Sequence, residues 1–460
     1  MTVRRGDFSQ GKVSRNILRL GLPMMLAELV HVLYNIVDRM YIGHMPEGGT
    51  VALTGLGVCF PLITLIGAFA NLFSTGGATL ATIARGEKKD EQAERIMGTS
   101  FTMLLLIGAF LTAVLYLSAP AVLRLLGGDD VTLPAALGYF RIYVLGSVPV
   151  LVSLGMNPFI NAQGFPRIGM MTVIIGAVLN IVLDPILIYA CGMEIRGAAL
   201  ATVVSQTASA LWVLFFLRSR RAVLRLTKLT VDREQLKGIV KLGLTGFTFR
   251  VTNSLTQAIV NIMLKAWGGA LSTLYVGAMS LINSVREIVS LPNSGIVAGG
   301  QSVMSYNYGA KEYRRVSECI RFIFLSGLGV NIAVWALIMF FPRLLAGIFT
   351  SDAQLIEKTA ECARIYFGAF PFMALQQAGQ STFVSLNRPA HALVFSMLRK
   401  VVLVAPLTLL LPGLGLGVHG VFWAELISQV IGASACFITM YLLVWRKMKA
   451  NRPLTEAPSQ

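Results

Sequence analysis

Asn180-Ile-Val-Leu-Asp184-Pro185 is the stretch that decides the reading of this chain, because it sets a carboxylate inside the long apolar run 173–190. An ionisable group at the centre of a membrane-spanning helix costs at least ~2.5 kcal/mol, and such groups face a cavity or a partner. Asn180 lies one helical turn before Asp184, so both residues share a helix face. Pro185 removes a backbone donor and opens the helix locally. We therefore expect Asp184 to handle a proton or a cation.

The composition around this stretch is that of an all-α integral membrane protein. Of the 460 residues, 55% are hydrophobic and 13% are charged, whereas soluble domains have about 25% charged residues. The mean hydropathy is +0.69. The net charge of +17 lies largely in short loops, which indicates membrane orientation rather than nucleic-acid binding. The five cysteines are scattered and form no CxxC pair, so no disulfide framework, metal cluster or cofactor is expected.

Twelve segments are long and apolar enough to span a bilayer, which takes about 20 residues. They are 16–43, 52–84, 97–120, 134–162, 167–190, 195–217, 238–266, 273–307, 318–342, 357–385, 390–412 and 416–445. Lys and Arg concentrate in alternate connections. The connection 218–241 alone holds eight, whereas all the connections on the other side hold four. This bias predicts that both termini are cytoplasmic, in the inner or plasma membrane.

An internal repeat divides the chain into two like halves. Leu20-Gly-Leu recurs as Leu242-Gly-Leu, Arg141-Ile-Tyr as Arg364-Ile-Tyr, and Ser205-Gln as Ser428-Gln, all at an offset of 222 or 223 residues. Six helices in each half give both halves the same orientation. The repeat therefore predicts two six-helix bundles related by a pseudo-two-fold axis along the membrane normal, with a substrate site between them. The predicted domains are an N-lobe (1–217), a cytoplasmic linker (218–237) and a C-lobe (238–460).

Three motifs make the chain resemble the multidrug and toxic compound extrusion (MATE) transporters over essentially its whole length. They are Leu20-Gly-Leu-Pro23 with the following Tyr34-Asn-Ile-Val-Asp38, the stretch Asn180–Pro185, and Tyr306-Asn-Tyr-Gly-Ala310 before a basic turn. The resemblance implies the MATE fold and a secondary active antiporter, not an enzyme. Such a protein exports amphipathic organic cations in exchange for protons or sodium ions by alternating access. We expect a monomer whose partners are lipid and cationic small molecules.

The resemblance also implies where the coupling ion binds. The constellation falls on four residues of the N-lobe: Asp38, Asn180, Asp184 and Thr202. Nearby cavity or hinge positions are Pro23, Tyr34, Tyr139 and Asn157. Counting along the helices places Asp38, Asp184 and Thr202 in the outer half of the membrane. Two carboxylates buried together disfavour each other's ionisation, so the pair can bind and release a proton near physiological pH.

Some members of the family bind a cation through acidic residues of the C-lobe, and this sequence departs from that pattern. The corresponding positions are Asn253 and Gln377, which carry no charge. A sodium site in the C-lobe is therefore not expected. Protons are the preferred coupling ion, and sodium at Asp38, Asn180, Asp184 and Thr202 is the alternative.

Each of these assignments has a structural alternative. Asp184 or Asp38 could form an ion pair that fixes two helices, and the Thr202 hydroxyl could bond its own backbone. Seven more charged residues lie within the predicted spans: Glu28, Arg250, Arg286, Glu287, Arg399, Lys400 and Glu425. We expect at least one inter-helix ion pair among them, since unpaired charges there are costly. Four of them are basic residues of the C-half, which keeps open a second function, a flippase for lipid-linked precursors with a pyrophosphate head group.

Overall fold

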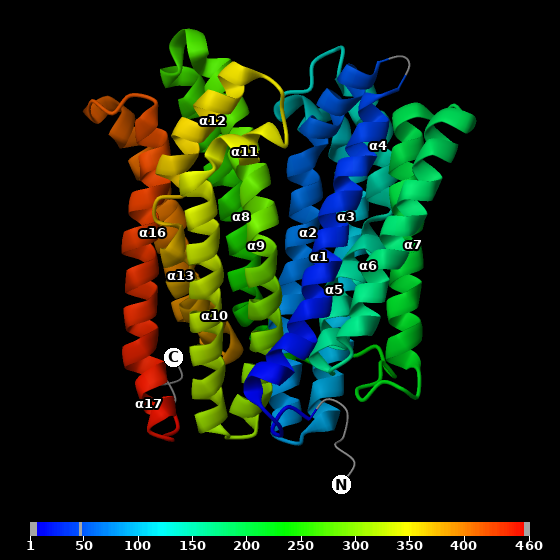
Figure 1. Cartoon of the computed structure of the whole chain (residues 1–460). Coiled ribbons are helices and arrows are strands. Elements are labelled where there is room, and N and C mark those ends of the chain that lie inside the picture. The colour runs from blue at the N-terminus through cyan, green and yellow to red at the C-terminus, as the bar shows by residue number, and fades with distance from the viewer. Residues whose placement is uncertain (1–6, 46–47, 455–460) are drawn as a thin grey trace. The chain divides into compact units, whose positions relative to one another are not determined.

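The computed structural model describes residues 7–45 and 48–454, and the ordered elements there are helices. The first half of the chain, coloured blue to green in Figure 1, contains α1 (Val13–Gly43), α2 (Gly49–Gly86), α3 (Asp90–Leu125), α4 (Leu133–Leu145), α5 (Ser147–Ala162), α6 (Pro166–Pro185), the π-helix η1 (Ile186–Ala190) and α7 (Glu194–Arg218).

The second half begins at α8 (Arg233–Trp267) and continues with η2 (Gly269–Leu271), α9 (Ser272–Gly309), α10 (Tyr313–Phe340), α11 (Pro342–Gly347), α12 (Ala353–Tyr366), η3 (Phe370–Phe372) and α13 (Met373–Ser385). It ends with α14 (Pro389–Met397), the π-helix η4 (Leu398–Val404), α15 (Ala405–Leu410), η5 (Leu411–Leu414), α16 (His419–Met440), the π-helix η6 (Tyr441–Trp445) and α17 (Arg446–Lys449).

Every one of the twelve predicted spans is helical. Within the described residues, eight helices are long and apolar enough to cross a membrane, and α4 with α5 makes a ninth if the bent pair is one span. The predicted spans over α8, α9 and α12–α13 are helical but do not meet this test of length and composition. The chain is therefore an all-α, multi-pass membrane protein.

The α4–α5 pair bends by 58° at Gly146. Val203 of α7 packs against this glycine, and a Cβ atom there would lie 2.5 Å from a Val203 methyl group. Pro149 follows three residues later and lacks the N–H that would bond back to the carbonyl of Leu145. A close helix crossing and a missing hydrogen bond thus explain the bend.

The chain packs as two compact units whose limits fall inside α1 and α8. Unit 1 contains Leu22–Phe247, and unit 2 contains Phe8–Gly21 together with the chain from Thr248 onward. The first turns of α1 therefore pack with the second half, and the first turns of α8 pack with the first half. The predicted boundaries at 217 and 238 follow the sequence repeat and stay a prediction.

Glycines explain the packing of these helix starts. Gly243 of α8 lies against the backbone of Leu72 in α2, where a Cβ atom would clash with the carbonyl oxygen. Gly21 of α1 lies in the same way against Gly295 of α9. Gly21 and Gly243 are equivalent positions of the repeat, so both units use the same close helix contact.

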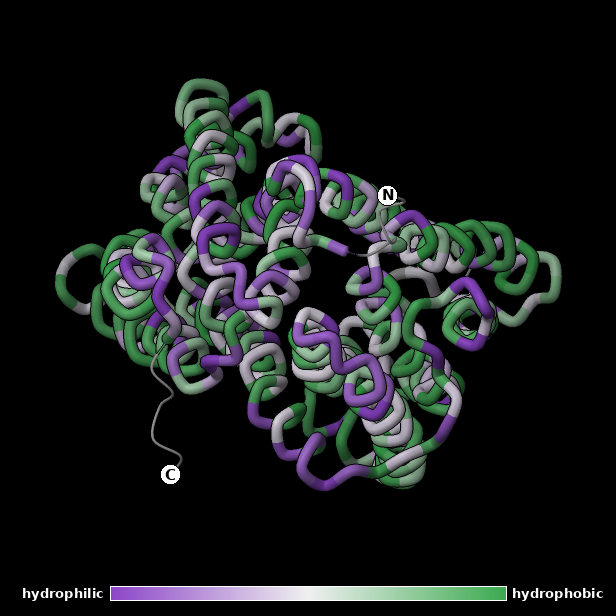
Figure 2. Tube along the Cα trace, turned by 90° about the horizontal axis from the view of Figure 1, so that it is seen from below, coloured by the Kyte–Doolittle hydropathy of each residue, from purple (hydrophilic) through white to green (hydrophobic). Residues whose placement is uncertain are grey.

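The outer surface of each unit is apolar. Leu117, Leu125, Phe215 and Phe340 are each more than 70% exposed. Hydrophobic residues run along the helices of both units in Figure 2. Such extensive exposed apolar surface is unfavourable in water, and it fits helices that face lipid.

Candidate functional site

Asn180 and Asp184 of α6 lie one helical turn apart inside unit 1. The Asn180 amide Nδ2 donates a hydrogen bond of 3.2 Å to the Asp184 carboxylate. Asp184 is 0% and Asn180 is 2% exposed. The predicted opening of the helix is present, because α6 ends at Pro185 and the wider π-helix η1 follows at once. A proline leaves a carbonyl without its helical partner, and π-helical turns often occur at functional sites.

Asp38 of α1 is the second carboxylate of the site. It is 9% exposed, and its carboxyl group lies within hydrogen-bonding reach of Asp184. One oxygen of each carboxyl group, Oδ1 of Asp38 and Oδ2 of Asp184, is buried without a donor among the described residues. Two carboxylates can form a hydrogen bond with each other only if one carries a proton. The geometry therefore suits a shared proton or a cation that replaces it.

The neutral residues predicted beside the carboxylates divide into two groups. Tyr34 lies close to Asp38 and contacts Asn35. Tyr139 stacks on Tyr143, with ring centroids 5.9 Å apart, and its hydroxyl lies within hydrogen-bonding reach of Thr202.

Thr202 and Asn157 bond to backbone instead of to the carboxylates. Thr202 donates to the backbone carbonyl of Ala198, at 3.0 Å, so the structural alternative considered for this hydroxyl is the one observed. Asn157 donates to the carbonyl of Gly169, at 3.2 Å.

A cavity of about 40 Å³ leads away from Asn180 within unit 1. This volume has room for a few waters. Its walls include Asn180 and three other predicted residues, Tyr34, Asn157 and Thr202. They also include polar residues that the sequence analysis did not assign to a site: His31, Ser205, Gln206 and Ser209. Their spacing on α1 and α7 places them on the same helix faces as the predicted residues. This periodicity of polar residues is the sequence signal from which they could have been predicted.

The three remaining predicted positions lie on α1, α8 and α13. Pro23 lies inside α1, two residues after the limit between the two packing units at Gly21. Asn253 of α8 lines a cavity within unit 2. Gln377 lies on α13, beside Gly327 of α10.

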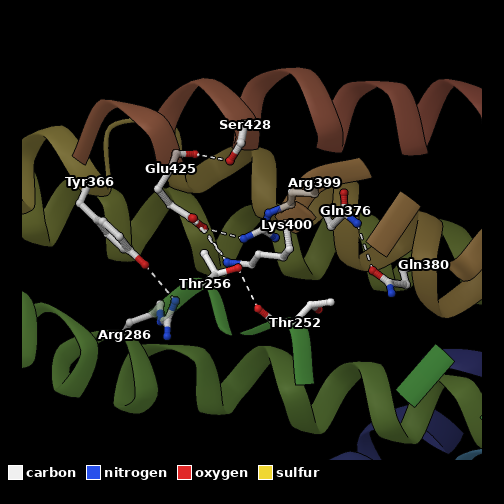
Figure 3. Close-up of polar contacts among 10 residues, drawn as sticks. All are labelled: Thr252, Thr256, Arg286, Tyr366, Gln376, Gln380, Arg399, Lys400, Glu425 and Ser428. Carbon is white, nitrogen blue, oxygen red and sulfur yellow. Dashed lines mark hydrogen bonds and ion pairs between the residues drawn. The ribbon is translucent and has the colours of Figure 1, made fainter. Parts of the chain in front are cut away.

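Unit 2 contains a buried group of charges that the sequence predicted only in outline. Arg399 and Lys400 of η4 converge on Glu425 of α16, and Arg286 of α9 points at Tyr366 of α12 (Figure 3). We call these five residues the C-lobe charge cluster. The predicted inter-helix ion pair is confirmed, since the Arg399 guanidinium lies 2.6 Å and the Lys400 ammonium 3.4 Å from the Glu425 carboxylate.

The other charged residues of the predicted spans do not join this cluster through a salt bridge. Glu28, Arg250 and Glu287 are exposed. The Arg286 guanidinium donates to the phenol oxygen of Tyr366, at 2.9 Å. The sequence did not indicate this pair, because nothing in the residues around Tyr366 marks its phenol as an acceptor for an arginine of another helix.

Comparison with known proteins places the chain in a family. The chain is 24% identical over 439 residues to the multidrug export protein MepA of Staphylococcus aureus (strain bovine RF122 / ET3-1), covering 95% of each chain. The MepA of Staphylococcus saprophyticus matches with the same identity and coverage.

A solved structure described as the outward-facing conformation of a multidrug resistance MATE family transporter of the MOP superfamily has the same fold. It superposes with a TM-score of 0.90 at 22% identity, over 98% of this chain and 100% of the other. The family model MatE matches residues 23–186 and 251–410, which is more than half of the chain. The chain therefore belongs to the MatE family of membrane proteins.

Proposed function

We propose that this protein is a secondary active antiporter of the cell membrane that exports amphipathic organic cations in exchange for protons. The observation that carries the proposal is the facing pair Asp38 and Asp184, both buried and both with an oxygen that no donor of the described residues reaches. An exporter driven by protons needs a group that binds a proton in one state and releases it in another. Two carboxyl groups that cannot easily ionise together meet that need.

Sodium is the alternative coupling ion at the same place. Oxygen ligands could come from the carboxylates of Asp38 and Asp184 and from Oδ1 of Asn180, which accepts no hydrogen bond from the part of the chain that the structure describes. Thr202 donates its proton to Ala198, which leaves its oxygen lone pairs available. We favour the proton because one proton between two facing carboxyl groups satisfies both, whereas sodium requires several oxygens to converge.

The cargo class rests on the relatives, which are named as multidrug export proteins. We propose that the chain acts by alternating access as a monomer with both termini cytoplasmic, and that Pro23 serves as a hinge in α1. The polar cavity beside Asn180 would couple cargo to the carboxylate pair, since a bound organic cation and a proton compete for the same negative charge.

The second candidate function is a flippase for lipid-linked precursors. One observation favours it: the C-lobe charge cluster holds three cations and one carboxylate, which suits an anionic cargo better than a cationic one. Uptake of a fluorescent organic cation by inverted vesicles discriminates the two functions, because a flippase of this kind would not accumulate the dye.

The experiment that tests the proposal uses purified protein in liposomes, with a proton gradient and a sodium gradient imposed separately. We expect ethidium transport under the proton gradient alone, and loss of that transport in Asp184→Asn and Asp38→Asn. Asp129→Asn is the matched control, because Asp129 lies in the connection between α3 and α4. Transport that follows only the sodium gradient would assign the site to sodium, and wild-type rates in Asp184→Asn would overturn the proposal.

A further inference from the structure

The C-lobe charge cluster has more positive than negative charge around a cavity. The cavity lies within unit 2 and is lined by Asn253, Thr256, Arg286, Tyr366, Lys400 and Glu425, among others. Lys400 is 5% exposed. Arg286, Arg399 and Lys400 face a single carboxylate, Glu425, while Glu287 next to Arg286 is exposed. Buried charges are costly unless they are paired. At this cavity the positive charges exceed the negative charge that the described residues supply.

The hydrogen bonds at the cavity leave donors in excess as well. Glu425 accepts from both Arg399 and Lys400. Arg286 has five N–H donors, and one of them is donated to the phenol oxygen of Tyr366. A phenol that accepts from arginine still has its own proton to donate. The cavity is thus lined by three donor groups, which are the ammonium of Lys400, the guanidinium of Arg286 and the hydroxyl of Tyr366, and by the carboxylate of Glu425.

The local backbone brings these charges together. Arg399 and Lys400 are consecutive, and on an α-helix consecutive side chains point about 100° apart. Here both lie in the π-helix η4, whose wider turn lets both side chains reach Glu425. π-helical segments are rare and often occur at functional sites. The Nε of Arg399 is also buried without a partner among the described residues, so the cluster is not a closed network of ion pairs.

We propose that this cavity binds a small monovalent anion, of the size of chloride or bromide, between Lys400 and Arg286. The cavity measures about 20 Å³, which has room for one or two water-sized groups and so for an ion of that size. The anion would neutralise part of the surplus positive charge. It would act independently of the proton site at Asp38 and Asp184.

The test measures the thermal stability of the purified full-length protein in detergent as chloride replaces gluconate at constant ionic strength and constant sodium. A ligand that binds the folded state raises the melting temperature with its concentration. We expect a saturable rise with chloride and with bromide in the wild type. Lys400→Met and Arg286→Met should each abolish the rise, since methionine keeps the apolar stem and removes the charge.

Arg343→Met is the control variant, because Arg343 belongs to the same unit but is exposed; it should keep the wild-type response. Glu425→Gln should bind chloride more tightly, because it removes the competing carboxylate. A bromide-soaked crystal should show anomalous density between Lys400 and Arg286. Equal melting temperatures in chloride and gluconate would overturn the proposal, and so would an unchanged chloride response in both Lys400→Met and Arg286→Met. None of these readouts requires transport, so the result stands apart from the test of export.

Discussion

Glu425→Gln tests whether the C-lobe charge cluster is held together by its one carboxylate. The substitution keeps the size of the side chain but removes the charge that Arg399 and Lys400 share. The side chain of Glu425 is 13% exposed, that of Arg399 11% and that of Lys400 7%. Water can therefore replace little of the lost interaction. Removing one partner of a buried ion pair typically costs 3–5 kcal/mol, about the cost we expect here, because the remaining charges stay buried without compensation.

The cysteines of the chain provide the assay. Three of them lie buried in unit 2 and one in unit 1, whereas Cys191 is exposed. In a Cys191→Ser background, a dye that becomes fluorescent on reaction with thiols reports unfolding, since buried thiols react only after exposure. The melting temperature and the denaturation midpoint of Glu425→Gln should both fall well below those of the parent.

Two further variants decide whether the cause is the buried charge. Glu357→Gln breaks the exposed pair with Arg343, whose side chains are 62% and 71% exposed, and it should change stability little. The double variant Glu425→Gln/Lys400→Met should lose less stability than Glu425→Gln alone, since it removes one uncompensated cation together with the carboxylate. If Glu425→Gln is no less stable than Glu357→Gln, the reasoning is refuted.

Three more predictions address the fold and the connections. Gly243→Val should destabilise the protein by about 1–3 kcal/mol, because the valine side chain would clash with the α2 backbone at Leu72. A melting temperature equal to that of the parent in the thiol-dye assay would contradict this close contact. Pro23→Ala should leave the melting temperature within a few degrees of the parent and slow ethidium transport, whereas unchanged transport would remove Pro23 as a hinge. The Thr132 backbone N–H and hydroxyl donate to Asp129 and hold the pKa of its carboxyl group below its usual value. The resulting stabilisation is present above the unfolded-state pKa of Asp129 and is lost as pH falls through the folded-state pKa. The melting temperatures of Asp129→Asn and the parent should therefore converge in acid, and a difference that stays constant with pH would argue against this stabilisation.

The sequence predicted the helices well because hydrophobic length is a local property that a bilayer imposes on each segment. It also predicted that Asn180 and Asp184 share a face, since one helical turn fixes that relation. The meeting of Asp38 with Asp184 depended on the resemblance, because the packing of α1 against α6 is not encoded in either helix alone.

Other features could not be predicted because they arise from contacts between distant segments. Gly21 and Gly243 were visible as a repeat, but their role in packing each helix start into the other half needs the backbones of α9 and α2. The π-helix at Lys400 breaks the regular turn of a helix that reads as uniform in sequence. The partner of Arg286 is a phenol and not a carboxylate, and counting charges does not find it.

The most direct test of the central proposal counts protons when the protein binds its cargo. Purified protein in weakly buffered detergent solution is mixed with ethidium, and a pH-sensitive dye records proton release. If an organic cation displaces the proton shared by Asp38 and Asp184, linkage requires that binding release about one proton per bound ethidium near neutral pH. The release should vanish in Asp184→Asn and persist in Asp129→Asn. Ethidium binding without proton release in the wild type, or equal release in Asp184→Asn, would contradict proton coupling at this carboxylate pair.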